Sequence, residues 1–312
     1  MAGIKIVSLG KSRGEKRVTN EDFEKIVDTS DQWIRSKTGI RSRYFAEEKS
    51  NEDMAFEAAK EAITKSGIRA EDIGLCIVCT FSAENSSPAV ACGVAGRLGL
   101  SENVLAFDLN GACAGFIFGC NVANGILSAD NMKGKYGLVI GSEKISPLID
   151  MEDRATCVLF GDGAGAAVLK FDEDVQFEFT AGCSANKEVL FCGGKERKIR
   201  MAGQEVYRFA VSTVPESIKK LLKIADRKEE EIDFFVCHQA NVRIIDGVSR
   251  RITKDSDKFY KNLYNYGNMS AASVPVALCE MDEDGLLDNG KSIVCSGFGA
   301  GLTYGSMLIT KE

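Results

Sequence analysis

Hydrophobic and polar positions along the chain follow two alternating periodicities. Residues 51–66, NEDMAFEAAKEAITKS, place Met54, Ala58 and Ala62 at helical spacing with polar residues between them, which predicts an amphipathic helix. Asn51 is the candidate N-cap of this helix, and Gly67 is placed to end it. A second helix is predicted over residues 204–225. Buried strands are predicted from apolar runs at 75–80, 104–109, 137–141, 157–160, 165–171, 233–237 and 292–296. This alternation of helices with apolar strands is typical of the α/β class.

Two short patterns occur twice along the chain. Residues 71–79, EDIGLCIVC, and residues 230–238, EEIDFFVCH, both run from charged positions into an apolar strand. FGDGAG at 160–165 is similar to FGAGLT at 298–303. The repetition predicts two similar halves packed on one another, residues 1–170 and residues 171–312, although echoes this short also arise by accident.

Composition and charge exclude several classes of protein. The chain has 312 residues, 45% of them hydrophobic, and a net charge of −6, which excludes intrinsic disorder and argues against nucleic acid as the main partner. No apolar stretch reaches the ~18 residues of a membrane span, and the amino terminus does not have the pattern of a signal peptide. The 11 cysteines are odd in number and irregularly spaced, so we expect reduced thiols in a cytoplasmic protein.

Cys113 lies where a predicted strand gives way to a predicted helix. The apolar run 104–109 reads as the strand, Asn110–Gly111 as a turn, and the small residues that follow as the start of a helix. A helix amino terminus stabilises a thiolate and lowers the pKa of the thiol, and its free N–H groups can hold an oxyanion. The alternative is that Cys113 is one more buried core thiol.

His238 and Asn268 are two further candidates in the second half of the chain. His238 is the only histidine and directly follows the predicted strand 233–237, and the carboxyl ends of parallel strands face ligand crevices. Asn268 follows Gly267 and precedes the helical pattern SAASVPVAL. Asn268 or Ser270 could cap that helix, or the Asn268 amide could polarise a substrate carbonyl. For both residues a purely structural role is the alternative.

Three other motifs lead to weaker hypotheses. The glycine turn at Phe160–Gly165 enters a strand-like run rather than a helix, so we reject a dinucleotide site there. The turn at Gly297–Gly301 could bring backbone amides close to a substrate, because few side chains intervene. The CxxC at Cys76–Cys79 lies inside an apolar strand with its thiols on alternating faces, which favours buried packing. With a single histidine and no second CxxC, we expect no metal site.

Seven segments carry a resemblance to a known family. They are, in chain order, TSDQWIRSKTGIRSRYFA (29–46), ACAGF (112–116), DRATCVLFGDGAGAAVL (153–169), MAGQEVYRFAV (201–211), HQANVRII (238–245), NYGNMSAASVPVAL (265–278) and GFGAGLTYGS (297–306). Together they resemble the thiolase-like condensing enzymes, and closely the β-ketoacyl-[acyl-carrier-protein] synthase III family. The resemblance implies a duplicated α-β-α-β-α layered fold, usually in a homodimer.

The resemblance also implies a reaction and a catalytic trio. Cys113, His238 and Asn268 match the family's catalytic residues. Cys113 would take an acyl group from acyl-coenzyme A, and malonyl-acyl-carrier-protein would then lose carbon dioxide and condense with it to give 3-oxoacyl-acyl-carrier-protein for fatty-acid biosynthesis. Backbone N–H groups of Cys113 and Ala300 would form the oxyanion hole. No cofactor is implied, since acyl-coenzyme A is a substrate of this acyltransferase.

Binding residues are implied in the same way. The coenzyme A site would use Trp33 stacked on the adenine, with Lys37, Arg154, Gly203 and Asn241. Lys37 stands where many members have arginine and lacks its planar fork, and Ala300 stands where glycine is common. Ser87 would reach the acyl pocket of the partner subunit. Four basic residues of one predicted helix would dock the acidic carrier protein, although each could also belong to a solvated face: Arg243, Arg250, Arg251 and Lys254.

The single histidine separates this chain from relatives of the same fold. Elongating condensing enzymes use two histidines, so the resemblance points to an initiating type, and Cys295 lies too early for the second cysteine of a thiolase. Three alternatives stay open: a condensing or acyl-transfer enzyme of polyketide or other secondary metabolism, a cysteine hydrolase, and a non-catalytic module that binds carrier protein.

Overall fold

The computed structural model describes residues 2–193, 197–288 and 290–312. These residues form two main β-sheets. The first has the strand order β1 (Gly3–Arg13), β7 (Gly163–Asp172), β6 (Tyr136–Glu143), β4 (Ile73–Cys79) and β5 (Leu105–Leu109). The second has the order β11 (Phe234–Cys237), β12 (Ser292–Gly299), β13 (Thr303–Thr310) and β8 (Glu178–Cys183).

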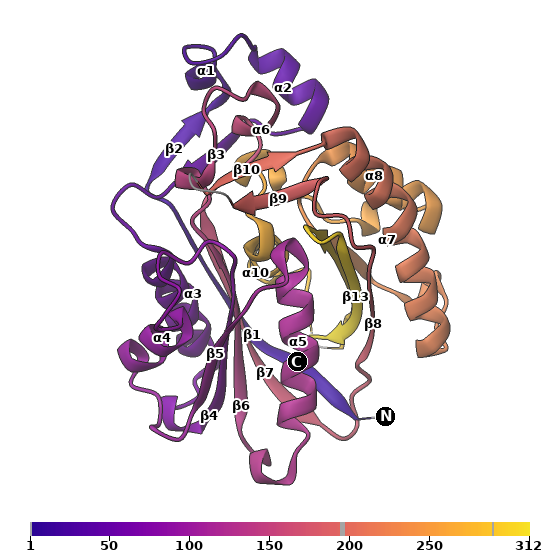
Figure 1. Cartoon of the computed structure of the whole chain (residues 1–312). Coiled ribbons are helices and arrows are strands. Elements are labelled where there is room, and N and C mark those ends of the chain that lie inside the picture. Colours follow the sequence, from indigo (N-terminus) through magenta and orange to yellow (C-terminus); the bar gives the residue numbers. More distant parts are fainter. Residues whose placement is uncertain (1, 194–196, 289) are drawn as a thin grey trace.

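Helices form three layers around the two sheets (Figure 1). The outer face of the first sheet is covered by α3 (Asn51–Ser66) and α4 (Val90–Leu98). Between the sheets lie α5 (Gly115–Leu127) and α10 (Ser273–Glu283). The outer face of the second sheet is covered by α7 (Gly203–Ala225), with α8 (Val242–Ile252) packed against α7. The order of layers is therefore α-β-α-β-α, as the family resemblance implies.

The two sheets repeat one strand arrangement. β1, β7, β6 and β4 follow one another with antiparallel, antiparallel and parallel pairing, and β8, β13, β12 and β11 repeat that order and those directions. The first repeated sequence pattern, at 71–79 and 230–238, leads into β4 and β11. The second, at 160–165 and 298–303, covers the turns that lead into β7 and β13. Both echoes therefore occupy equivalent positions in the two sheets, and the chain passes from one sheet to the other between Asp172 and Glu178.

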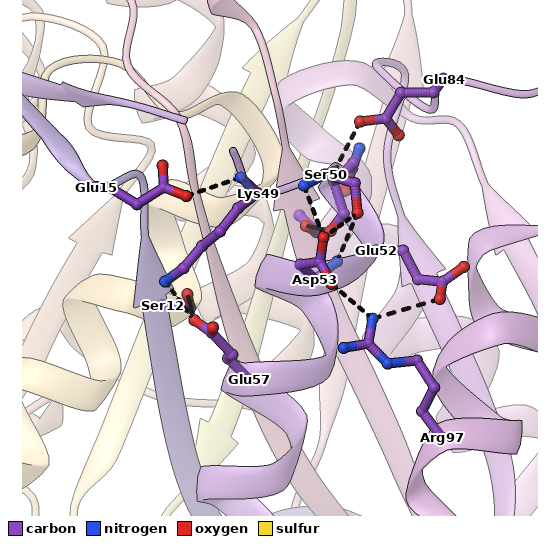
Figure 2. Close-up of polar contacts among 11 residues, drawn as sticks. Ser12, Glu15, Lys49, Ser50, Glu52, Asp53, Glu57, Glu84 and Arg97 are labelled. Atoms are coloured by element: carbon purple, nitrogen blue, oxygen red, sulfur yellow. Dashed lines mark hydrogen bonds and ion pairs between the residues drawn. The ribbon is translucent and has the colours of Figure 1, made fainter. Parts of the chain in front are cut away.

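The helix predicted over residues 51–66 has those bounds, but its N-cap is Ser50 and not Asn51. The Ser50 hydroxyl accepts the Asp53 N–H at 3.0 Å, and the Asp53 carboxylate accepts the Ser50 N–H at 2.9 Å, a reciprocal pair that satisfies two free donors. Figure 2 shows this pair, together with Arg97, which reaches Asp53 at 2.9 Å. The helix ends at Gly67 as predicted, with φ 67°.

Residues 157–160 do not form a strand, so this prediction is wrong. Residues Arg154–Cys157 form the short helix α6, whose start is capped by the Asp153 side chain accepting the Ala155 N–H at 2.9 Å. Only Phe160 makes a β-bridge, to Asn268. The run is apolar because Cys157, Val158 and Phe160 pack into the core that continues under the second sheet, and not because it is a strand.

Further short elements connect these layers, and the apolar pattern did not predict them. The strands are β2 (Lys16–Thr19), β3 (Ser42–Phe45), β9 (Leu190–Gly193) and β10 (Lys198–Met201), and the helices are α1 (Asn20–Phe23), α2 (Asp31–Thr38) and α9 (Leu263–Tyr266). β1, β8 and β13 were also not predicted. Within the described ranges, no helix has the length and apolar character needed to cross a bilayer.

Candidate active site

One cavity of about 800 Å³ lies between the two halves of the molecule. Cys113 from the first half and His238 and Asn268 from the second half all line its wall. Its remaining surface is largely apolar and includes Phe81, Leu190, Ile199, Val206 and Phe298. The three residues that are far apart in sequence therefore face one cavity.

Cys113 is presented by a tight turn at the start of α5. β5 ends at Leu109, and Ala112–Ala114 form a single 3-10 turn that leads into the helix. Ala112 has φ 46°, a left-handed conformation, and its N–H donates to the Asn110 side chain at 3.2 Å. The turn points the Cys113 side chain into the cavity instead of along the strand.

The expected low pKa of Cys113 is not found. Burial raises the pKa of this thiol to about 12, and the neighbouring Ser270 hydroxyl opposes the shift without cancelling it. The side chain does reach the cavity, but protein atoms surround it. The cost of removing a thiolate from water therefore exceeds the stabilisation of the thiolate by the amino terminus of α5. With a pKa raised in this way, the Cys113 thiol stays protonated near neutral pH.

The glycine turn after β12 packs directly against Cys113. A side-chain carbon on Gly299 would lie 2.8 Å from the Cys113 backbone nitrogen, and one on Gly297 would lie 3.2 Å from the Cys113 carbonyl oxygen. Only glycine permits this approach. Ala300, the residue after the strand, lines the cavity beside Cys113.

His238 follows β11 and is almost completely buried, with 1% of its surface exposed. Its Nδ1 lies 2.7 Å from the Ser273 hydroxyl at the start of α10. Ser273 also accepts the Gln239 N–H at 3.3 Å, so its own hydrogen is free to donate to Nδ1. This assignment places the imidazole proton on Nε2. Burial lowers the pKa of His238 to about 3, so the ring is neutral and Nε2 is a hydrogen-bond donor.

Asn268 does not cap a helix. The turn that follows it starts from Met269, and α10 starts from Ala272 without a side-chain cap. Instead, the Asn268 side-chain oxygen accepts the Ser270 N–H at 2.8 Å. Because the oxygen is used in this way, the amide NH₂ group is what Asn268 can offer to a ligand in the cavity.

The residues expected at the coenzyme A end lie together. Trp33, Lys37, Gly203 and Asn241 line the cavity. Arg154 does not line it, but its guanidinium lies 4.1 Å from the centre of the Trp33 ring. Asn241 caps α8 by accepting the Arg243 N–H at 2.8 Å, and it donates to the Lys37 carbonyl at 3.0 Å.

The other predicted residues lie outside the cavity. Ser87 is exposed and is not part of the cavity wall of its own chain. The four basic residues expected to dock a carrier protein are all exposed on and just after α8: Arg243, Arg250, Arg251 and Lys254. Cys76 and Cys79 are buried on β4 and unpaired, as the packing interpretation of the CxxC predicts.

Sequence patterns missed two polar residues beside the site. Ser273 orients His238 from α10, and Glu143 ends β6 with no exposed surface. Ser273 lies in the segment 265–278 that carries the family resemblance, but no spacing distinguishes it from its neighbours, and Glu143 lies in none of the seven segments. Their positions depend on how α10 and β6 pack across the interface of the two halves. A local sequence pattern cannot predict this packing.

The layered fold and a cysteine, a histidine and an asparagine around one cavity define a thiolase-like condensing enzyme. Models of 3-oxoacyl-[acyl-carrier-protein (ACP)] synthase III and of its C-terminal part match residues 107–185 and 222–311. The chain is 42% identical to β-ketoacyl-[acyl-carrier-protein] synthase III of Clostridium acetobutylicum and 43% identical to that of Natranaerobius thermophilus, over 99% of each chain.

A solved structure gives the same result. The 3-oxoacyl-[acyl-carrier-protein] synthase III of Aquifex aeolicus superposes with a TM-score of 0.93 at 39% identity, covering 98% of this chain and 99% of that one. The chain belongs to the β-ketoacyl-[acyl-carrier-protein] synthase III family. It is an acyl-transferring condensing enzyme.

Proposed function

We propose that this enzyme starts fatty-acid biosynthesis: Cys113 takes an acyl group from acyl-coenzyme A and passes it to malonyl-acyl-carrier-protein, giving 3-oxoacyl-acyl-carrier-protein. The observation that carries this proposal is the meeting of Cys113, His238 and Asn268 on one cavity wall. Relatives above 40% identity over nearly the whole chain bear the name of that synthase.

The first half-reaction is acyl transfer. The Cys113 sulfur attacks the thioester carbonyl, and the carbonyl oxygen becomes an anion that backbone N–H groups of Cys113 and Ala300 can hold. Gly299 lets the two backbone segments come this close. One such donor contributes roughly 3 kcal/mol to the transition state. The bond to the coenzyme A sulfur then breaks, leaving acyl-Cys113.

The second half-reaction is decarboxylative condensation. Loss of carbon dioxide from the malonyl group places negative charge on its thioester oxygen. Nε2–H of His238 and the NH₂ group of Asn268 are two neutral donors directed at this space, and a neutral imidazole fits the low pKa of His238. The enolate carbon then attacks the acyl-Cys113 carbonyl, and the bond to the Cys113 sulfur breaks, which releases 3-oxoacyl-acyl-carrier-protein and regenerates the cysteine. The sequence of steps needs no metal or organic cofactor.

Substrate binding uses two separate surfaces. Trp33, Lys37, Gly203 and Asn241 at the cavity would hold coenzyme A, with the Arg154 guanidinium stacked on Trp33. The exposed basic residues on and just after α8 would attract the acidic carrier protein through charge complementarity. The two surfaces meet at Asn241, which lines the cavity, donates to the Lys37 carbonyl and is the N-cap of α8.

A homodimer in the cytoplasm belongs to the same proposal. β5 is the edge strand of the first sheet and exposes 48% of Leu105, and a free edge of this kind can pair with a second copy. Ser87, exposed in one chain, would then be placed to reach the acyl pocket of the other.

Priming of a polyketide pathway is the second candidate function. A priming β-ketosynthase of the R1128 polyketide pathway superposes with a TM-score of 0.92 at 29% identity. We favour a role in fatty-acid biosynthesis, because the relatives named β-ketoacyl-[acyl-carrier-protein] synthase III are more similar to this chain in sequence than the priming β-ketosynthase is.

Initial rates and product analysis test the condensation reaction and separate it from hydrolysis. We would measure condensation of acetyl-, isobutyryl- and octanoyl-coenzyme A with malonyl-acyl-carrier-protein and identify the product by mass spectrometry. The proposal predicts a 3-oxoacyl-acyl-carrier-protein from at least one primer. A free acid would indicate a hydrolase, and no turnover with any primer would contradict the proposal.

A further inference from the structure

A buried carboxylate lies beneath Cys113 and is not used by the mechanism above. Glu143, the last residue of β6, has 0% of its surface exposed. Its Oε2 accepts three hydrogen bonds, from the Thr80 hydroxyl at 3.1 Å, the Phe81 N–H at 3.3 Å and the Ser82 hydroxyl. Its Oε1 has no hydrogen-bond partner within the described part of the chain. Burying a carboxylate is costly unless both oxygens are satisfied, so the open oxygen requires an explanation.

Ser270 is the side chain that lies between this carboxylate and the nucleophile. It is 1% exposed, lines the cavity, and its hydroxyl also has no well-formed hydrogen bond to any described residue. Its turn, Ser270–Ala272, packs against both the turn that carries Cys113 and strand β6, which ends in Glu143. The Ser270 hydroxyl lowers the pKa of both Cys113 and Glu143. A small adjustment of the side chain would complete both hydrogen bonds, and such contacts are often loose before substrate binds.

The backbone holds Ser270 in this position. Ser270 has φ 47°, a left-handed conformation that a serine adopts at a cost. The Asn268 side chain holds this conformation by accepting the Ser270 N–H at 2.8 Å. A strained residue whose hydroxyl reaches two reactive groups indicates a functional role for the hydroxyl.

Cys113 needs a proton acceptor that the catalytic trio does not supply. The thiolate, not the thiol, is the nucleophile, and burial keeps Cys113 protonated. His238 offers an N–H donor at Nε2, while its Nδ1 is occupied by Ser273. Asn268 cannot accept a proton.

We propose that Glu143 accepts the Cys113 proton through the Ser270 hydroxyl. The proton leaves the sulfur for the Ser270 oxygen as the Ser270 proton passes to Oε1 of Glu143, which gives a thiolate and a neutral carboxylic acid. The thiolate forms the new bond to the acyl carbon, and the bond to coenzyme A breaks. The proton then returns through Ser270 to the departing coenzyme A sulfur, which restores the carboxylate. This inference rests on the acyl-transfer step of the proposed function.

The surroundings of Glu143 suit this role. Burial raises the pKa of Glu143 to about 7, and bonds from Ser82, Ser270 and Thr80 limit the rise. A carboxylate with such a pKa is partly ionised near neutral pH and can both take and return a proton. The titratable groups that face it are thiols, Cys79 from β4, Cys113 and Cys192 from β9, and burial raises the pKa of each.

The test is the rate at which iodoacetamide alkylates Cys113 as a function of pH, read on the Cys113 peptide by mass spectrometry because Cys92 and Cys183 are also exposed. In the unmodified enzyme we expect the rate to rise through an inflection near pH 7, as Glu143 ionises. Glu143→Gln and Ser270→Ala should both lose this inflection and react at least tenfold more slowly at pH 7.5.

Ser82→Ala is the matched control. It removes a donor to the other carboxylate oxygen and leaves Oε1 and Ser270 in place. Because the Ser82 hydrogen bond lowers the pKa of Glu143, its loss should move the inflection to higher pH without abolishing it. A purely structural role for Glu143 would leave the inflection in Glu143→Gln, and that result would overturn the proposal.

A folding check and a readout that needs no substrate keep the test decisive. Quenching of Trp33, the only tryptophan, by added coenzyme A reports that each variant is folded with its cavity intact; if Glu143→Gln fails this check, Ser270→Ala carries the test. Alkylation needs no acyl substrate. An enzyme that keeps the inflection but accepts no acyl-coenzyme A would therefore contradict the proposed function and not the proton route.

Discussion

The two central helices begin with turns of the same shape. In the first half, the Asn110 side chain accepts the Ala112 N–H at 3.2 Å, and Ala112 has φ 46°. In the second half, the Asn268 side chain accepts the Ser270 N–H at 2.8 Å, and Ser270 has φ 47°. Both turns pass through one 3-10 turn into a helix between the sheets.

The chemistry carried by the two turns differs. The residue after the left-handed position is Cys113 in the first half, facing the cavity, and Ala271 in the second, 1% exposed and packed in the core. The Asn110 residue is exposed, whereas Asn268 is 8% exposed. The same backbone turn thus holds the proposed nucleophile in one half and the proposed hydrogen-bond donor in the other, and the difference lies in side chains and burial.

The largest effect should come from Cys113→Ala. This substitution gives the first turn the same residue that the second turn has at the equivalent position, Ala271. We expect acyl transfer from radiolabelled acetyl-coenzyme A to fall below detection, because Cys192, the other thiol that lines the cavity, does not pack against the glycine turn. Quenching of Trp33 by coenzyme A should persist. Adding Ala271→Cys should not restore labelling, since position 271 is buried. Labelling of Cys113→Ala would refute the nucleophile assignment.

Asn268→Ala should have the next largest effect. Release of carbon dioxide from malonyl-acyl-carrier-protein should fall by about 100-fold, equivalent to roughly 3 kcal/mol, through loss of one donor to the enolate oxygen. Acylation of Cys113 should slow as well, because Asn268→Ala also removes the acceptor that holds Ser270 in place. Asn268→Asp separates the two roles of this residue: it keeps the oxygen that holds Ser270 but removes the NH₂ donor, so it should lose decarboxylation to the same extent. Full decarboxylation by Asn268→Asp would show that only the turn matters.

Ser273→Ala removes the partner of His238 and should have a moderate effect. The cost of one buried hydrogen bond is about 1 kcal/mol, so decarboxylation should fall by roughly fivefold. Because His238 is the only histidine, its ring nitrogens give unambiguous NMR signals. The unmodified enzyme should show the proton on Nε2 and no titration between about pH 5 and 8, and Ser273→Ala should show mixed tautomers. A single Nε2–H tautomer in both proteins would contradict the positioning role.

Sequence patterns predicted what is local and missed what depends on packing. The helix at 51–66 has the predicted bounds because its apolar spacing and Gly67 act within the segment. The run at 157–160 was misread because burial against the other half makes a short helix and a turn as apolar as a strand. Motifs indicated Cys113, His238 and Asn268. Glu143 and Ser273 could not be predicted, because only the meeting of β6 with the start of α10 brings them to the site.

The smallest effect should come from Asn110→Ala. This variant tests whether Asn110, the residue equivalent to Asn268 in the first turn, also donates a hydrogen bond to the enolate. The substitution removes the acceptor that holds Ala112 in its left-handed conformation. Because this bond is solvent-exposed, its loss should cost at most about 1 kcal/mol and slow acylation only a few-fold. Decarboxylation by enzyme that is already acylated should not change, since the Asn110 amide is not one of the buried donors. A loss of decarboxylation as large as that of Asn268→Ala would instead mean that both turns supply donors to the enolate, and that the two halves differ in the nucleophile alone.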